Sequence, residues 1–267
     1  MVSAYVRYLS PTWGVVAALL GGFLFLETFA TPFHRQFYVP DPRISYPYTA
    51  DSIPDARLAV YACVVPCVLI VLATATQYLR SSRDQKQRIV HLANVSCLAL
   101  ALALGLNGFV TEFIKVKVGR PRPDFLDRCG LSPKSPVPGL YTVADCTAPY
   151  GEKALQDGFK SFPSGHSSFA WCGMNFLNLW ISGHYRLYTG RSGFSVSKLV
   201  PLGPALVALH ICISRSQDYK HDALDITCGS LLGLAASWWS YRQFFPSVAD
   251  DSSDLPLVPA QEPVLPV

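Results

Sequence analysis

Six apolar runs divide this chain of 267 residues, and they constrain its fold more than any other feature. Only 15% of the residues are charged, whereas ordinary soluble domains carry about 25%. A helix needs about 17–25 apolar residues to cross the hydrocarbon core of a bilayer. We therefore expect an all-α, integral-membrane bundle of six transmembrane helices rather than a soluble protein with six buried core helices. The runs cover approximately Trp13–Ala30, Leu58–Leu79, Ile89–Thr111, Ser167–Gly183, Leu199–Ser214 and Ile226–Tyr241.

The first run and the C-terminal segment set the expected ends of the single domain. Only Arg7 precedes the first run, which contains Glu27 and lacks a small-x-small cleavage site. We therefore expect a retained span and not a cleaved signal peptide. Residues 246–267 are acidic and rich in proline, without a periodic apolar pattern. The sequence predicts a six-span domain over residues 1–245 and a disordered cytosolic tail over residues 246–267.

The basic residues are distributed unevenly among the loops. The loop between the second and third runs carries Arg80, Arg83, Lys86 and Arg88 against Asp84, and the loop between the fourth and fifth runs carries three cations and no acid. Short loops rich in lysine and arginine remain cytosolic. We therefore expect both termini in the cytosol and the long third loop on the lumenal or extracellular side, in an endomembrane or the plasma membrane.

Two cysteines in the third loop differ from the other six, which lie in the apolar runs. Cys129 and Cys146 could form a disulfide if this loop faces an oxidising compartment. Their separation in space does not follow from the sequence, so the pairing stays open.

A cluster of cations follows the third run, in the segment Lys115-Val-Lys-Val-Gly-Arg-Pro-Arg-Pro123. Arginine offers a planar fork that suits phosphate oxygens, and lysine offers a compact positive charge. Lys115 and Arg122 are therefore candidate phosphate ligands. Basic residues also flank many membrane spans, so this segment alone indicates either a phosphate site or a membrane anchor.

A second motif, Pro163-Ser-Gly-His166, opens the fourth run. Ser164 and Gly165 should leave backbone N–H groups free at a helix start, where anions bind readily. His166 would then lie beside the bound anion. In the alternative interpretation, Ser164 only caps the helix and His166 is an ordinary interfacial residue.

A third motif begins with Ser214-Arg215 and continues to His221 and Asp225. His221 and Asp225 are four residues apart, so a helix would place them on one face. Asp225 could accept a hydrogen bond from one imidazole nitrogen and leave the other free as a nucleophile. Arg215 would supply another guanidinium for phosphate. An interfacial pair without chemistry is the alternative.

The three motifs together read Lys-x6-Arg-Pro, Pro-Ser-Gly-His and Ser-Arg-x5-His-x3-Asp. This pattern resembles the complete signature of the type 2 phosphatidic acid phosphatase family and spans residues 115–225. The surrounding residues are similar to those of fungal and plant lipid phosphate phosphatases and diacylglycerol pyrophosphate phosphatases. The resemblance implies a six-helix, haloperoxidase-like core with its active site at one membrane face, and it implies neither a metal nor another cofactor.

The resemblance also implies a role for each site residue. His221 would attack phosphorus to form a phosphohistidine, Asp225 would orient it, and His166 would protonate the leaving lipid oxygen and then activate water. The phosphate would be held by Lys115, Arg122, Ser164, Gly165 and Arg215. The implied function is Mg²⁺-independent hydrolysis of phosphatidate, lysophosphatidate or diacylglycerol pyrophosphate. No nucleic-acid partner is expected, and the preferred lipid and oligomeric state stay open.

Two alternatives and one departure from the pattern remain. The chain could be a polyisoprenyl-pyrophosphate phosphatase, or a non-catalytic membrane scaffold or transporter, although the intact His166, His221 and Asp225 argue against the latter. Vanadate haloperoxidases share similar residues but are soluble.

Asp222 stands where many relatives carry a second histidine, and an acid there would oppose a dianionic substrate unless it points away. Glu112 either holds Lys115 or simply lies near the end of its helix.

Overall fold

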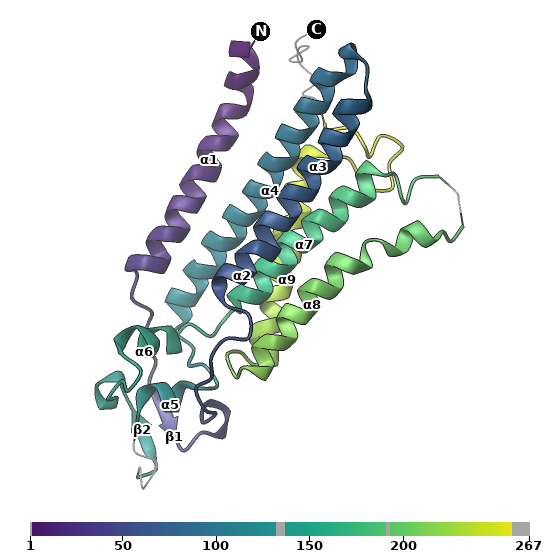
Figure 1. The fold of residues 1–267 in the computed structure, drawn as a ribbon. Helices are drawn as coiled ribbons and strands as arrows, with labels where there is room; N and C mark the ends of the chain where they lie inside the picture. Colours follow the sequence, from purple (N-terminus) through teal and green to yellow (C-terminus); the bar gives the residue numbers. More distant parts are fainter. Residues whose placement is uncertain (1, 132–136, 191–192, 258–267) are drawn as a thin grey trace.

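The computed structural model describes residues 2–131, 137–190 and 193–257. Long helices lie side by side, and a cap of short helices and strands covers one end of them (Figure 1). The start of α1 and the end of α9 lie toward the opposite end. The long segments are α1 (Val2–Phe29), the continuous α2, η2 and α3 (Asp55–Ala59, Val60–Val64, Val65–Arg80), α4 (Arg83–Val118), α7 (Gly165–His184), α8 (Leu202–Gln217) and α9 (Ala223–Phe244).

Four of these stretches identify a membrane protein. Among the described residues, Leu9–Phe29, Asp55–Arg80, Arg83–Val118 and Val196–Gln217 are long and apolar enough to cross a bilayer. The first and last of them leave most of their apolar side chains exposed, as lipid-facing helices do. All six apolar runs expected from the sequence overlap long helical segments, so a helical membrane protein is confirmed, whereas six transmembrane helices stay a prediction.

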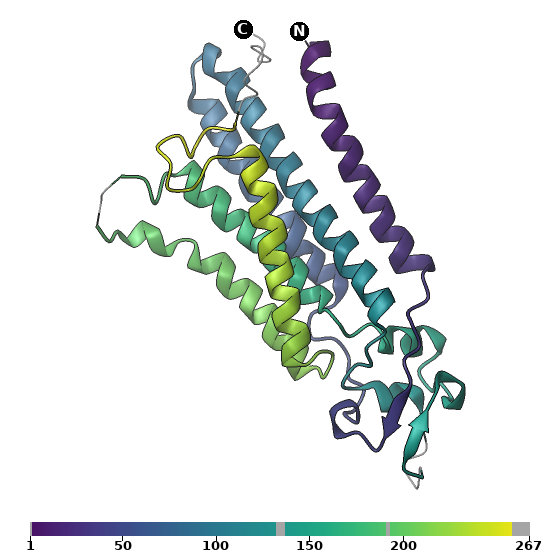
Figure 2. The ribbon, with the colours of Figure 1, turned by 180° about the vertical axis from the view of Figure 1, so that it is seen from behind.

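Helix α7 lies inside the bundle, where it contacts α9, α8, α4 and the segment α2–η2. Figure 2, which views the molecule from behind, shows α9 (yellow) crossing in front of α7. Small residues allow close contact between membrane helices. A Cβ atom at Gly173 would lie 1.9 Å from the carbonyl oxygen of Ala62, in the π-helical turn η2. Because protein surrounds α7, it also carries buried hydroxyl groups at Ser167, Ser168 and Ser182.

The cap is built from the first and third loops and contains the only strands among the described residues. Strands β1 (Phe37–Val39) and β2 (Gly139–Tyr141) pair antiparallel, with Phe37 opposite Tyr141. This small sheet is a departure from the all-α expectation. An aromatic cluster that includes Phe37, Phe125 and Phe159 holds the cap together. Its helical turns are η1 (Pro42–Ile44), α5 (Phe125–Cys129), η3 (Val143–Asp145) and α6 (Glu152–Gly158).

The disulfide that the sequence left open is present in this cap. Cys129, at the end of α5, is bonded to Cys146, which directly follows η3. The bond therefore joins the two sides of the third loop around the gap at residues 132–136 that the structure does not describe.

The described part of the C-terminal tail differs from the expected disorder. The side chain of Ser253 is buried, and its hydroxyl donates to the carbonyl oxygen of Gly183 at 3.2 Å. The amide of Leu257 donates to the carbonyl oxygen of Phe244 at 2.7 Å. Residues 246–257 therefore pack against the ends of α7 and α9, and residues 258–267 lie outside the described residues. A short turn, η4 (Val196–Leu199), precedes α8.

Candidate functional site

The first cation motif begins in the last turn of α4 and continues into the cap. The helix ends at Gly119, whose φ of +58° is left-handed. A Cβ atom there would lie 1.8 Å from the carbonyl oxygen of Phe33, so both the conformation and the space require glycine. Beyond this turn, the amide of Arg122 donates to the carbonyl oxygen of Gly158 at 2.8 Å. Lys115 therefore remains on the helix, whereas Arg122 is fixed by the cap.

The second motif forms the start of α7, as its sequence predicts. Ser164 is the N-cap residue, and its hydroxyl accepts from the amide of Ser167 at 3.4 Å. The amide of Ser164 donates to the carbonyl oxygen of Asp225 at 3.0 Å. The expectation of a free Ser164 amide is therefore wrong. Gly165 and His166 are the first two helical residues, whose amides have no acceptor within the helix.

Two glycines show how closely the three motifs approach one another. A Cβ atom at Gly165 would lie 2.9 Å from Nζ of Lys115, so the ammonium group lies directly over the start of α7. A Cβ atom at Gly229 would lie 2.4 Å from the carbonyl oxygen of Ser164, so α9 passes against the same turn. The side chains needed for a phosphate site thus converge at one end of the bundle.

His221 lies just before α9 and is almost completely buried. Its Nδ1 atom lies 2.8 Å from the carbonyl oxygen of Ser161 and 3.8 Å from Oδ2 of Asp225. The hydroxyl of Ser161 in turn donates to Oδ2 of Asp225 at 2.6 Å. His221 therefore bonds to the carbonyl oxygen of Ser161 and not, as expected, to Asp225. Ser161 stands between them, and sequence reasoning missed it.

The surroundings of His221 favour its neutral form. Burial lowers the pKa of His221 well below its ordinary value, because the charged imidazolium is poorly solvated there. The positive charges of Arg122 and Lys115 lower this pKa further. A neutral imidazole with its Nδ1 hydrogen on Ser161 presents a lone pair at Nε2, as a nucleophile requires.

Carboxylates from neighbouring loops hold the two candidate phosphate-binding arginines. Arg122 donates to the carboxylate of Asp157 at 2.7 Å. Arg215 is 1% exposed at its side chain and donates to Asp51 at 2.7 Å and to Asp218 at 2.6 Å. Of these three acids, Asp51 comes from the first loop, which sequence reasoning had not connected with the site.

The first loop also reaches His166. The Nε2 atom of His166 lies 2.8 Å from the carbonyl oxygen of Ile53 and 3.8 Å from the carboxylate of Asp55. His166 lies 13% exposed at its side chain. The structure thus brings His166 and Arg215 under one segment of the first loop.

Asp222, the residue that departs from the expected pattern, caps α9. Its carboxylate accepts from the amide of Asp225 at 2.9 Å, and the Asp225 side chain reciprocates in a capping box. It also forms an ion pair with Arg120, which donates to Asp225 at 2.8 Å as well. The negative charge of Asp222 is therefore compensated locally by Arg120.

Glu112 holds Lys115, one of the two possibilities left open above. Its carboxylate lies 3.5 Å from Nζ of Lys115 and 2.8 Å from Nζ of Lys160. Lys160 also pairs with Glu27 at 3.1 Å, which links α1 to the cap. The buried Lys160 and the partly buried Lys115 therefore share one buried carboxylate behind the start of α7.

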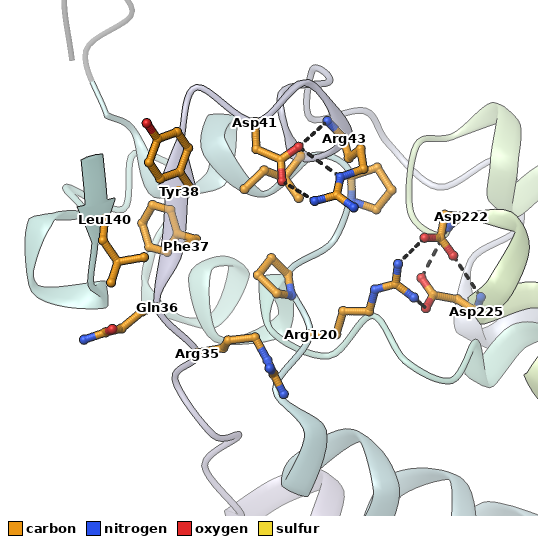
Figure 3. A pocket seen from close by; sticks show the side chains of 13 residues that line it. Arg35, Gln36, Phe37, Tyr38, Asp41, Arg43, Arg120, Leu140, Asp222 and Asp225 are labelled. Atoms are coloured by element: carbon orange, nitrogen blue, oxygen red, sulfur yellow. Dashed lines mark hydrogen bonds and ion pairs between the residues drawn. The ribbon is translucent and has the colours of Figure 1, made fainter. Parts of the chain in front are cut away.

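A cavity of about 350 Å³ lies on the cap side of this site. Figure 3 shows Arg120 paired with Asp222 and Asp225, and all three residues line this cavity. On the opposite wall, Arg43 is paired with Asp41. His166, His221, Lys115 and Arg215 are not among its lining residues, so the cavity adjoins the site without containing its histidines.

Comparisons with known proteins found relatives that match most of the chain. The chain is 34% identical to the probable diacylglycerol pyrophosphate phosphatase 1 of Schizosaccharomyces pombe over 93% of its length and 86% of the relative's. It is 37% identical to diacylglycerol pyrophosphate phosphatase 1 of Saccharomyces cerevisiae, over 85% and 76% of the two lengths. It is 34% identical to lipid phosphate phosphatase 1 of Arabidopsis thaliana, over 81% and 62%.

The search of solved structures gave no match. The family model of the PAP2 superfamily matches residues 96–249, which include all three motifs and more than half of the chain. The protein belongs to the PAP2 superfamily.

Proposed function

We propose that this protein is an integral-membrane lipid phosphatase that hydrolyses phosphatidate, lysophosphatidate or diacylglycerol pyrophosphate without Mg²⁺. The observation that carries the proposal is the meeting of three cations and two histidines around the start of α7. Lys115 lies over Gly165, and the positive charges of Lys115 and Arg122 reach His221. The similarity to lipid phosphate and diacylglycerol pyrophosphate phosphatases supports the substrate class.

The reaction proceeds in two steps at this site. Nε2 of neutral His221 attacks phosphorus, and the bond from phosphorus to the lipid oxygen breaks as His166 transfers a proton to that oxygen. Water then attacks the phosphohistidine, His166 takes a proton from the water, and inorganic phosphate and free His221 are released. Lys115, Arg122, Arg215 and the amides at the start of α7 stabilise the charge on the phosphoryl oxygens.

The proposed topology has six spans. Helices α7 and α9 join the four strongly apolar stretches as spans, because both run alongside them through the bundle. The basic loops at the other end would face the cytosol together with both termini. The disulfide in the cap supports an oxidising environment for the motif side, either lumenal or extracellular.

A substrate panel with purified protein in detergent micelles and EDTA tests the function. We expect phosphate release from phosphatidate or diacylglycerol pyrophosphate, and loss of at least about 1,000-fold in kcat for His221→Ala. Quenching the wild type during turnover with alkaline detergent should trap a ³²P label that is stable to base and labile to acid. A requirement for added Mg²⁺, or full activity of His221→Ala, would overturn the mechanism.

One alternative within the same chemistry is hydrolysis of polyisoprenyl pyrophosphates. The same panel decides between them, because the alternative predicts a higher kcat/KM for the polyisoprenyl substrate than for the glycerolipids. A non-catalytic scaffold or transporter would release no phosphate from any of them.

A further inference from the structure

A segment of the first loop lies directly across the candidate phosphate site. This strap, residues 49–55, is fixed by Asp218, which accepts from the Ser52 amide at 2.8 Å, and by the hydroxyl of Thr49, which donates to the Asp218 carbonyl oxygen at 2.7 Å. It reaches Arg215 through Asp51 and His166 through the Ile53 carbonyl. Two of the residues expected to handle the phosphate are therefore engaged by one short piece of chain.

Each of the three guanidinium nitrogens of Arg215 already donates to a protein oxygen, which engages three of its five N–H groups. Its Nε atom donates to Ser214 at 3.2 Å, one Nη atom donates to Asp51 and the other to Asp218. Because the Arg215 side chain is 1% exposed, a phosphate that binds it through its planar fork competes with these acids for the same nitrogens. Both carboxylates would also repel a phosphate dianion if they stayed beside it.

Asp51 is the acid that can leave. Asp218 is buried, lies one turn from Arg215 on the same segment and anchors Ser52 with its carboxylate. Asp51 lies in irregular chain, and its side chain is 44% exposed. It contacts the site by accepting a hydrogen bond from Arg215. Moving Asp51 into water therefore disturbs little besides the strap.

We propose that Asp51 is an affinity-determining residue that occupies the phosphate position on Arg215 and is displaced, with the strap, when substrate binds. The proposal rests on the phosphatase function given above. Displacement also removes the Ile53 carbonyl from Nε2 of His166, so that the proton on this nitrogen becomes available to the leaving oxygen. One movement thus frees a phosphate donor and the general acid together.

Isothermal titration with inorganic phosphate, the reaction product, tests the proposal on the full-length protein in detergent micelles. Removing the competing charge in Asp51→Asn should tighten phosphate binding by about 5- to 20-fold and lower KM by a similar factor. Asp41→Asn is the matched control, because Asp41 is another first-loop acid paired with an arginine. Its phosphate affinity should stay within about twofold of the wild type.

A second variant and a second measurement keep the test independent of the folding of Asp51→Asn. Ser52→Ala removes the hydroxyl that donates to Oδ1 of Asp218 at 2.5 Å and keeps Asp51, so it should also tighten phosphate binding, by a smaller factor. In the wild type, hydrogen exchange at residues 49–55 should accelerate when phosphate is added. Unchanged or weaker phosphate binding by both variants, or slower exchange, overturns the proposal, since Asp51 would then hold Arg215 in place for the ligand. A wild type that neither binds phosphate nor hydrolyses lipid phosphates overturns the proposed function itself.

Discussion

The carbonyl oxygen of Ser161 accepts the hydrogen bond from Nδ1 of His221, at 2.8 Å. A backbone carbonyl is always an acceptor, so it fixes the imidazole tautomer whatever the charge of nearby acids. Asp225 lies 3.8 Å from the same nitrogen and bonds instead to the Ser161 hydroxyl and to Arg120. We therefore expect Asp225 to be a positioning residue that acts on His221 through Ser161.

The substitution Asp225→Asn should consequently reduce activity less than it would if the carboxylate bonded directly to the histidine. Loss of the orienting acid costs about 10⁴-fold in kcat where the acid itself fixes the tautomer. Here we expect a loss of about 10- to 100-fold, because the Ser161 carbonyl remains. Steady-state kinetics with phosphatidate measure it. Ser161→Ala keeps this carbonyl and should lose less than about tenfold. A 10⁴-fold loss in Asp225→Asn would mean that the carboxylate itself orients His221.

The pH dependence follows from the lowered pKa of His221. Burial and the charges of Arg122 and Lys115 favour the neutral form in the folded protein, whereas an exposed histidine titrates near pH 6.5. Protonation of His221 should therefore begin to reduce activity only at a pH below 6.5. Between pH 6.5 and the lowered pKa, the unfolded chain binds a proton at His221 that the folded chain excludes. The free energy of unfolding therefore falls as the pH drops through this range, and it loses nothing from His221 above pH 6.5.

A pH profile of kcat, measured with single-turnover phosphate release, checks this expectation. Lys115→Met removes one of the positive charges and should move the acid limb of the profile upward, toward pH 6.5. An acid limb already at pH 6.5 in the wild type, with no movement in Lys115→Met, would contradict the assignment.

The buried carboxylate of Glu112 is shared between two lysines, and this sharing predicts a coupling. Lys160→Met would leave Glu112 paired with Lys115 alone and draw the ammonium group away from the phosphate. We expect KM for phosphatidate to rise about tenfold with a smaller change in kcat. Adding Glu112→Gln should restore much of the affinity, because the competing charge is then gone, and a double-mutant cycle measures this interaction. Additive effects of the two substitutions would refute the coupling.

Asp222 should matter more for the stability of α9 than for the reaction. Asp222→Ala removes the N-cap and should lower the free energy of unfolding by about 0.5–2 kcal/mol. Asparagine also caps helices well, so Asp222→Asn should keep most of this stability while losing the charge that faces Arg120. Thermal unfolding and phosphate release from the two variants separate the cap from the charge. Equal destabilisation by both substitutions would indicate that the ion pair with Arg120 dominates.

The parts of the fold and site that depend on residues close together in the sequence could be predicted from it. The apolar runs predicted the long helices, and Ser164 predicted the start of α7, because these signals are local. The residues that meet through space could not be predicted. Asp51 and Ile53 lie more than 100 positions from the residues they contact, and Ser161 acts through its backbone, which carries no side-chain signal.

The two helices with the weakest apolar signal have a physical explanation. Helices α7 and α9 pack mainly against other helices, so small and hydroxyl-bearing residues replace large apolar ones on their buried faces. Ser168 accepts from Asn107 at 3.2 Å, and Ser240 donates to the Ala99 carbonyl oxygen at 2.7 Å. Hydropathy alone therefore underestimates the helices that carry the candidate site.

The disulfide between Cys129 and Cys146 has a consequence for when the protein becomes competent. Its neighbour Arg128 binds Asp157 at 2.8 Å, and Asp157 is the acid that holds Arg122. Disulfides form and persist after a chain has reached an oxidising compartment. We therefore expect the position of Arg122 to be fully set only after this disulfide has formed, and a reducing agent to loosen Arg122 through Arg128 and Asp157.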